Sequence, residues 1–159
     1  MSAIGRMYRA PFAAVTVSAA QDLFEIVAPS DAVVELVGFQ VGQTSDYGDA
    51  AAEGLAILVK TGATTSGSGG SSVTPTPGEK GSPAFGGTVE ANNTTKASGG
   101  TIVTHLSRVL NIQAGLDVML TPEETVVLSP SERMTIELVA APADALTMNG
   151  EAIFREIGG

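Results

Sequence analysis

The residues of this 159-residue chain that could do chemistry are few, and their spacing matches no catalytic motif. There is no cysteine and His105 is the single histidine, so disulfides, thiolate sites and histidine clusters are excluded. His105 lies within an apolar, β-branched run, which favours a structural histidine over a catalytic base. Glu123 and Glu124 follow Pro122 in a turn, which favours solvated charges over an acid–base pair. The sequence therefore predicts no enzyme activity and no cofactor.

Two loop-like stretches contain residue types found at ligand sites. Asp46, Asp49 and Glu53 in the polar stretch 42–53 carry carboxylate oxygens of the kind that bind calcium. Their spacing does not match an EF-hand loop, so solvated turn acids are the favoured interpretation, and ion binding stays open. The glycine-rich stretch 67–72 lacks the third glycine of the dinucleotide fingerprint. The chain also has no P-loop and no nucleophile elbow.

Composition limits the partners of the protein. Seventeen acidic and eight basic residues give a net charge of −9, and an acidic surface repels the phosphates of nucleic acid. No apolar run approaches the roughly 20 residues that a membrane helix needs. The N-terminal residues do not resemble a secretory signal, so synthesis in the cytosol is expected. We therefore predict neither a nucleic-acid partner nor a membrane partner.

Strand periodicity is clearest between Pro130 and Pro142. There Met134, Ile136 and Leu138 alternate with polar residues, which is the pattern of a strand with one buried face. Proline is tolerated at the ends of such a strand but not within a central ladder. Further strands are predicted from Pro11 onward and over residues 22–28, 33–41, 55–61, 101–112, 116–120, 124–128 and 148–157.

Eight or nine strands with no convincing helix predict an all-β fold. A helix over residues 101–112 is the weaker alternative, because Val, Ile and Thr dominate that stretch. Turn signals at short intervals indicate an antiparallel two-sheet β-sandwich, with the jelly roll as the leading topology. A chain of this length is suited to a single domain with a single core.

Three local features refine this prediction. The connection at residues 18–21 has a length suited to a hairpin between the first two strands. Gly38, within a run that is apolar on both faces, suggests a bulge in a central strand. Arg108 falls on the apolar face of the stretch 101–112, which predicts a bulge, a bend or a subunit contact near Ser107.

Two segments stand apart from the strand pattern. Residues 62–100 are rich in Gly, Ser, Thr and Pro and have few apolar anchors, so a long irregular segment within the sandwich is predicted. Residues 1–10 place Arg6 and Arg9 around Met7 and Tyr8, which suggests a short basic arm or a frayed terminus. The predicted organisation is an arm over residues 1–10 and one sandwich domain over residues 11–159.

Several local patterns span most of the chain and resemble small structural proteins encoded in tailed-bacteriophage head-gene clusters. They are residues 12–26 (Phe-Ala-Ala-Val-Thr-Val-Ser-Ala-Ala-Gln-Asp-Leu-Phe-Glu-Ile), 42–49 (Gly-Gln-Thr-Ser-Asp-Tyr-Gly-Asp), 89–95 (Val-Glu-Ala-Asn-Asn-Thr-Thr), 128–133 (Leu-Ser-Pro-Ser-Glu-Arg) and 142–148 (Pro-Ala-Asp-Ala-Leu-Thr-Met). None of these patterns is catalytic. Within that group, the chain resembles the capsid decoration, or cement, proteins.

This resemblance implies a structural protein of the virion. It implies a β-sandwich or jelly-roll body, a homotrimer, and binding of the major capsid protein on the outer capsid surface after synthesis in the host cytoplasm. It implies no catalytic residues. Arg and Tyr are common interface anchors, and the arm and the segment 62–100 are the expected contact regions. The candidate capsid or subunit contacts are Arg6, Met7, Tyr8, Arg9, Tyr47, Phe85 and Arg108.

Two other classes were weighed against a cement protein. One is a head-fibre or tail-appendage sandwich that binds a carbohydrate or another virion protein, a role that usually uses exposed aromatic residues to stack on sugars. Only Tyr8, Tyr47 and a few Phe residues are available for such stacking. The other is a cupin-type enzyme, which requires several metal-binding histidines and is disfavoured by a single one.

Overall fold

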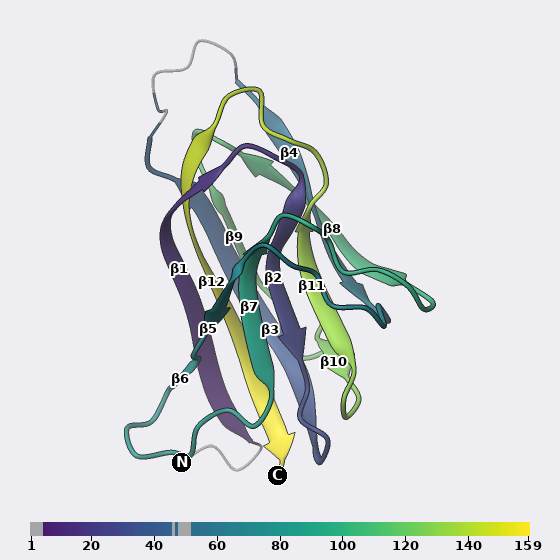
Figure 1. The fold of residues 1–159 in the computed structure, drawn as a ribbon. Helices are drawn as coiled ribbons and strands as arrows, with labels where there is room; N and C mark the ends of the chain where they lie inside the picture. Colours follow the sequence, from purple (N-terminus) through teal and green to yellow (C-terminus); the bar gives the residue numbers. More distant parts are fainter. Residues whose placement is uncertain (1–4, 46, 48–51) are drawn as a thin grey trace.

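The structure is a computed structural model that describes residues 5–45, 47 and 52–159, and within them it contains twelve strands and no helix. The strands form two stacked sheets in which every paired strand is antiparallel (Figure 1). The predicted all-β, antiparallel two-sheet sandwich is therefore confirmed.

The first sheet has the strand order β10–β3–β12–β1–β6, and β9 pairs with β3 on the same edge as β10. The long strands β3, β12 and β1 form its centre. The bounds of its strands are β1 (Arg6–Val17), β3 (Ala32–Gln43), β6 (Thr76–Pro77), β9 (Leu116–Met119), β10 (Val126–Leu128) and β12 (Leu146–Gly158).

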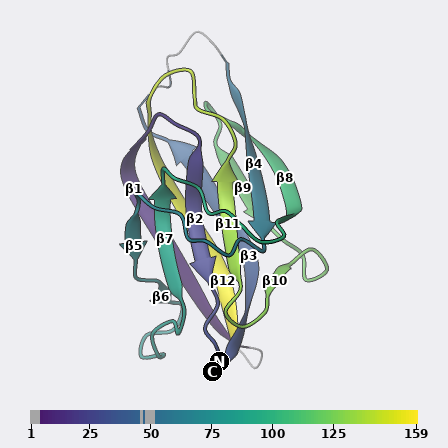
Figure 2. The same cartoon turned by 45° about the vertical axis from the view of Figure 1, so that its right-hand side comes forward.

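The second sheet has the strand order β5–β7–β2–β11–β4–β8. In both views of the ribbon, β8 and β10 lie on the side of the sandwich away from β5 and β6 (Figures 1 and 2). The bounds of its strands are β2 (Gln21–Val27), β4 (Gly54–Thr61), β5 (Ser71–Val73), β7 (Thr88–Asn93), β8 (Val103–Asn111) and β11 (Arg133–Leu138).

The core lies between the two sheets and is built from the inward positions of the strands. Met134, Ile136 and Leu138 of β11 are fully buried, as their alternation predicted. Across the sandwich, the rings of Phe12 and Phe24 lie 5.2 Å apart between centroids. Each fully buried side chain of this size contributes about 1.5–3 kcal/mol of transfer free energy, so contacts of this kind hold the sheets together.

The predicted arm over residues 1–10 is wrong for its described second half. β1 begins at Arg6, which pairs with Glu156 of β12, and the ladder continues without a break to Phe12. The ring of Tyr8 is fully buried, 6.0 Å from Phe154 and 5.4 Å from Phe85 between centroids. Tyr8, Ala10 and Phe12 are buried at alternate positions up to the register shift after Phe12, so the segment belongs to the core.

The predicted irregular segment 62–100 is wrong in part, because it contains β5, β6 and β7. Isolated bridges also join Thr65 to Ser98 and Ser68 to Thr95. These short strands extend existing sheets, since β7 pairs with β2 and β6 pairs with β1. The segment therefore gains order from backbone pairing at the edges of the sandwich without forming a core of its own.

The predicted hairpin between the first two strands is also wrong. β1 and β2 lie in different sheets, so the connection after Val17 crosses the sandwich. One edge of β1 is occupied by β12, and the apolar residues of both β1 and β2 must face the same core. Crossing between the sheets satisfies both conditions.

Bulges occur close to where the sequence placed them. The β3–β12 register shifts between Leu36 and Gly38, which leaves Val37 as the extra residue beside the predicted Gly38. A Cβ atom at Gly38 would lie 2.4 Å from the carbonyl oxygen of Val118, so only glycine allows β9 to approach here. In β8 the extra residue is His105, close to the predicted irregularity near Ser107.

The buried position of Tyr8 generates a test of the fold. Its hydroxyl donates a hydrogen bond to the carbonyl oxygen of Pro83 at 2.9 Å. Tyr8→Phe removes that bond and is expected to lower the free energy of unfolding by about 1 kcal/mol. Tyr8→Ala also leaves a cavity and is expected to lower it by about 3–5 kcal/mol. Urea unfolding measures both changes.

Tyr47 offers the matched control, because its side chain is 63% exposed. Tyr47→Ala should change the free energy of unfolding by no more than about 0.5 kcal/mol. Equal effects of the Tyr8→Ala and Tyr47→Ala substitutions would contradict the burial of Tyr8 in the core.

Candidate interaction site

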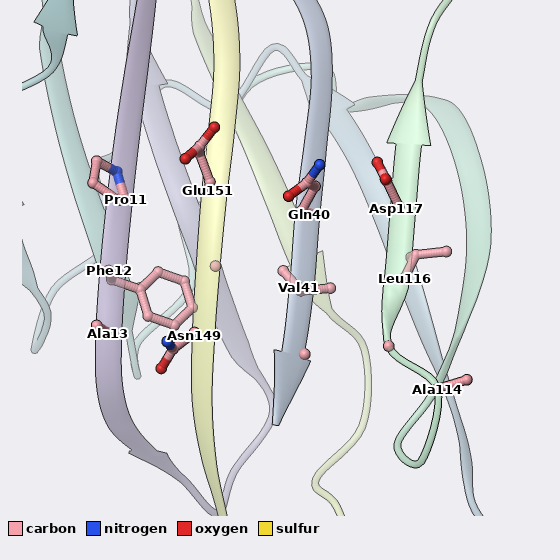
Figure 3. Close-up of a pocket in the computed structure, with 13 residues that line it drawn as sticks. Pro11, Phe12, Ala13, Gln40, Val41, Ala114, Leu116, Asp117, Asn149 and Glu151 are labelled. Carbon is pink, nitrogen blue, oxygen red and sulfur yellow. The ribbon is translucent and has the colours of Figure 1, made fainter. Parts of the chain in front are cut away.

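A groove of about 510 Å³ crosses the outer face of the first sheet (Figure 3). Its lining comes from four strands, β1, β12, β3 and β9, together with the turn before β9. It is open along its length and does not enclose a chamber. The lining residues are Pro11, Phe12, Ala13, Gln40, Val41, Gly42, Ala114, Gly115, Leu116, Asp117, Asn149, Gly150 and Glu151.

Small residues form the floor of this groove. A Cβ atom at Gly150 would lie 2.5 Å from Cε1 of Phe12, so this glycine makes room for the phenylalanine ring on the core side of β12. Gly42 faces open space, since the nearest atom to an added Cβ is 4.0 Å away. Glycine and alanine positions therefore give the groove a flat floor.

Polar side chains form one row across the groove. Gln40 pairs in register with Glu151 of β12 on one side and with Asp117 of β9 on the other. Figure 3 shows Glu151, Gln40 and Asp117 side by side on adjacent strands. The Glu151 carboxylate accepts a hydrogen bond from Arg9 at 2.8 Å. A flat floor with a row of hydrogen-bonding groups is suited to an extended protein segment.

Two segments, residues 62–70 and 94–101, are joined by isolated antiparallel bridges and lie over the outer face of the second sheet; they are here called the strap. Its anchor is Glu25 of β2, a carboxylate that is 2% exposed. Glu25 accepts hydrogen bonds from the hydroxyl of Ser66 at 2.7 Å, the backbone N–H of Gly67 at 2.8 Å and Nδ2 of Asn93 at 3.1 Å. It also pairs with Nε of Arg133 at 2.7 Å. One buried charge therefore joins β2, β7, β11 and the strap.

A second group of charges lies under the other half of the strap. Lys96 contacts Glu137 of β11 at 2.5 Å, and Lys60 of β4 pairs with the same carboxylate. Although burial acts in the opposite direction, hydrogen bonds from the two lysines hold the pKa of Glu137 below its usual value. Asp22 accepts a hydrogen bond from the backbone N–H of Ala97 at 2.7 Å, and burial raises the pKa of Asp22 to about 6.

Four of the seven predicted contact residues lie at the start of β1. Tyr8 is buried in the core and cannot touch a partner in this fold. Arg6 pairs with Glu156 at 3.2 Å, and Arg9 pairs with Glu151. Met7 is half-buried between them along the strand. The structure thus brings these residues together, but three of the four are held by contacts within the chain.

The other three predicted contact residues are dispersed. Phe85 is half-buried, and its ring lies 4.9 Å from that of Phe154, so it caps the core. Tyr47 is exposed and its hydroxyl donates a hydrogen bond to the carbonyl oxygen of Gln43 at 2.6 Å. Arg108 of β8 donates to the carbonyl oxygen of Ser107 and is half-buried.

Sequence reasoning missed the exposed apolar residues of β8, β9 and β10. Val109 of β8 is 65% exposed on the outer face of the second sheet, because the inward residue next to it is Leu110. Met119 and Val127 are exposed on the outer face of the first sheet, opposite to Val109 across the sandwich. These residues therefore lie on two separate faces.

The possible metal and catalytic residues are not assembled into a site in the part of the chain that the structure describes. Within that part, no three His, Cys, Asp or Glu side chains are grouped to hold a metal ion. Asp46 and Asp49 lie outside the described residues, and Glu53 accepts a hydrogen bond from the backbone N–H of Ala143. His105 Nε2 lies 2.8 Å from the Thr61 hydroxyl.

None of the described segments forms a helix able to cross a membrane.

Comparisons with known proteins add no assignment. No family model, no curated protein and no solved structure was found to match this chain.

The anchor of the strap generates a stability prediction. Glu25→Gln removes the charge that pairs with Arg133, and Arg133 is itself only 17% exposed. The substitution leaves the buried guanidinium of Arg133 without an opposite charge. This is expected to lower the free energy of unfolding by about 3 kcal/mol. Glu90→Gln on β7 is the control, because this half-buried carboxylate accepts one hydrogen bond, from Asn93. It should cost about 1 kcal/mol or less in urea unfolding.

Asp22 generates a pH prediction. Because its folded pKa is raised to about 6, its ionisation works against folding as pH rises from about 4 through 6. Asp22→Asn keeps an oxygen that can accept from Ala97 and removes this ionisation. The variant is therefore expected to become more stable than the wild type above about pH 6 and to lose that advantage near pH 4. A stability difference that does not change with pH would contradict the assignment.

Proposed function

We propose that this protein is a structural virion protein that binds the outer surface of a phage capsid and joins neighbouring major capsid subunits. The family patterns at residues 12–26, 42–49, 89–95, 128–133 and 142–148 suggest this role. The observation that carries the proposal is the open groove across the first sheet, which fits an extended segment of a partner better than an enclosed small molecule. The protein acts in this role as a homotrimer without catalysis.

The order of the strands supports the jelly-roll form expected of such a body. One sheet contains β1, β12, β3 and then β9 with β10, and the other contains β2, β11, β4 and β8. Successive strands from β1 to β4 alternate between the sheets, and so do β10, β11 and β12. We infer that the chain is a jelly roll with the segment 62–100 inserted between its fourth and fifth strands.

A rigid sandwich is suited to joining capsid subunits, because its binding surfaces are preformed and need little ordering when they bind. The polar row of Gln40, Asp117 and Glu151 would fix the position of a bound segment by hydrogen bonds. The flat floor beside Gly42 lets the backbone of that segment approach closely. This account replaces the N-terminal arm with the groove as the proposed capsid contact.

The second candidate is a head-fibre or tail-appendage protein that binds a carbohydrate through the same groove. Gln40, Asp117 and Asn149 offer partners for sugar hydroxyls. Phe12 is the aromatic residue of the lining, and it is only 8% exposed, so it offers little surface for stacking on a sugar ring. The groove therefore favours a protein segment, and glycan-array binding by the purified chain would favour the carbohydrate instead.

The proposal is tested by filling the groove. Gln40 is exposed on β3 at the centre of the polar row, and an aromatic residue is well tolerated in a strand. Gln40→Trp is expected to reduce the occupancy of assembled capsids by about tenfold or more, because the bulky ring blocks an approaching segment. The measurement is co-sedimentation with capsids of the encoding virus that lack this protein.

Thr76→Trp is the matched control, because Thr76 is exposed on β6 at the far edge of the same sheet. It should leave capsid occupancy unchanged. If the wild-type protein fails to bind capsids, or if both variants bind as well as the wild type, the proposed use of the groove is wrong.

A further inference from the structure

The groove across the first sheet carries charge of one sign. Of the thirteen described residues that line it, Asp117 and Glu151 are acidic, and none is Lys, Arg or His. The chain as a whole has a net charge of −9. A concave surface lined by charge of one sign concentrates the electrostatic field within it. The groove therefore attracts a cationic group more strongly than an open surface with the same charges does.

The polar groups at the β1 end of the groove are already used by contacts within the chain. Arg9 pairs with Glu151 at 2.8 Å. The backbone N–H of Ala14 donates a hydrogen bond to Oδ1 of Asn149, also at 2.8 Å. Ala14 has a φ of 55° at the bulge in β1, a conformation that is costly for a residue with a Cβ atom. The strained bulge and its bond to Asn149 fix the shape of the groove at this end.

The polar groups at the β9 end of the groove have no such contacts. Asp117 is exposed on β9, and its side chain forms no ion pair or hydrogen bond with another described residue. Gln40 lies opposite it on β3, and its exposed side chain likewise forms no hydrogen bond within the described part of the chain. The Asp117 carboxylate and the Gln40 amide, which lie side by side in Figure 3, are therefore available to a ligand.

The chemistry of the β9 end fits an organic cation better than a metal ion. One carboxylate and one amide oxygen are too few for a calcium ion, which takes about six to eight oxygen ligands. Met119 is the next outward residue of β9 after Asp117 and is 58% exposed. The methylene stem of a Lys or Arg side chain packs on apolar surface of this kind while its charged end reaches a carboxylate.

The length of the groove fits an extended polypeptide. Its lining strands follow one another in the order β1, β12, β3 and β9. Neighbouring strands lie about 4.8 Å apart, so the row from β1 to β9 spans about 14 Å. An extended chain rises about 3.3 Å per residue, and about four or five residues therefore cross the groove. A single amine or a free amino acid is too short to fill it.

We propose that the β9 end of the groove binds a Lys or Arg side chain, and that the groove as a whole binds the extended segment of the partner protein that carries this side chain. Asp117 pairs with the charge, Gln40 forms a second hydrogen bond, and Met119 contacts the methylene stem. The inference rests on the proposed function, in which the partner is the major capsid protein. It adds the chemistry by which the segment is recognised and the end of the groove at which its basic residue lies.

The test is selection of binders to the purified full chain from a displayed library of random peptides long enough to cross the groove. Peptides recovered on the wild type are expected to be enriched in Lys or Arg at one position. Asp117→Asn is expected to weaken the binding of a recovered peptide by about fivefold, because the ion pair is lost. Asp117→Lys is expected to weaken it by about tenfold or more, because it places like charges together. Binding to the wild type should also weaken as the salt concentration rises.

Glu79→Lys is the matched control, because Glu79 is exposed in the loop after β6, at the edge of the first sheet away from β9. It changes the net charge by the same amount as Asp117→Lys and should leave peptide binding unaffected. Gln40→Trp fills the groove and should abolish the binding of the recovered peptides. Circular dichroism confirms that each variant is folded.

Recovered peptides without enrichment in Lys or Arg would overturn this inference, and so would binding that survives Asp117→Lys unchanged. The absence of any peptide that binds the wild type but not Gln40→Trp would also overturn it. Capsid co-sedimentation separates the two proposals. A wild-type protein that binds basic peptides in the groove but does not bind capsids would refute only the cement function. Capsid binding that is lost in Gln40→Trp but unchanged in Asp117→Lys would refute only the basic anchor.

Discussion

Two stacked β-sheets have four edges at which backbone N–H and C=O groups lack partners, and the way these edges are covered shapes the rest of this protein. On one side, the segment 62–100 adds the short strands β5, β6 and β7, and Phe85 caps the core beside Tyr8. On the other side, the described part of the chain has no comparable addition, and β8 ends the second sheet there. The two sides of the sandwich are therefore covered to different degrees.

The closed side depends on charges that are buried at an energetic cost. Glu25, Glu137 and Asp22 would be destabilising beneath the strap without partners. Arg133 and Lys96 supply opposite charge, and the backbone N–H groups of the strap supply further donors. The Gly, Ser and Thr residues of the strap suit this role, because small residues let the backbone approach a carboxylate closely. The composition that suggests an irregular loop is also what allows the loop to bind a charged sheet.

The sequence predicted those parts of the fold that depend on hydrophobic periodicity. The alternation in β11 and the two-sided apolar run in β3 identified central strands, and a bulge was located within one residue of Val37. Periodicity failed at the start of β1, where Arg6 and Arg9 resembled a basic arm and concealed the inward Tyr8. It could not predict the strap, because hydrogen bonds to single carboxylates leave no repeating pattern.

The interaction surfaces were less predictable than the fold for a related reason. The groove requires β1, β12, β3 and β9 to be adjacent, and strand order depends on long-range pairing that no local pattern encodes. Val109 of β8 looks like a core residue in the sequence, yet it lies on the outer face of the second sheet, where it is exposed. Which face of a strand is covered depends on the neighbours that the assembled sandwich supplies, so hydrophobicity along the chain does not reveal such a surface.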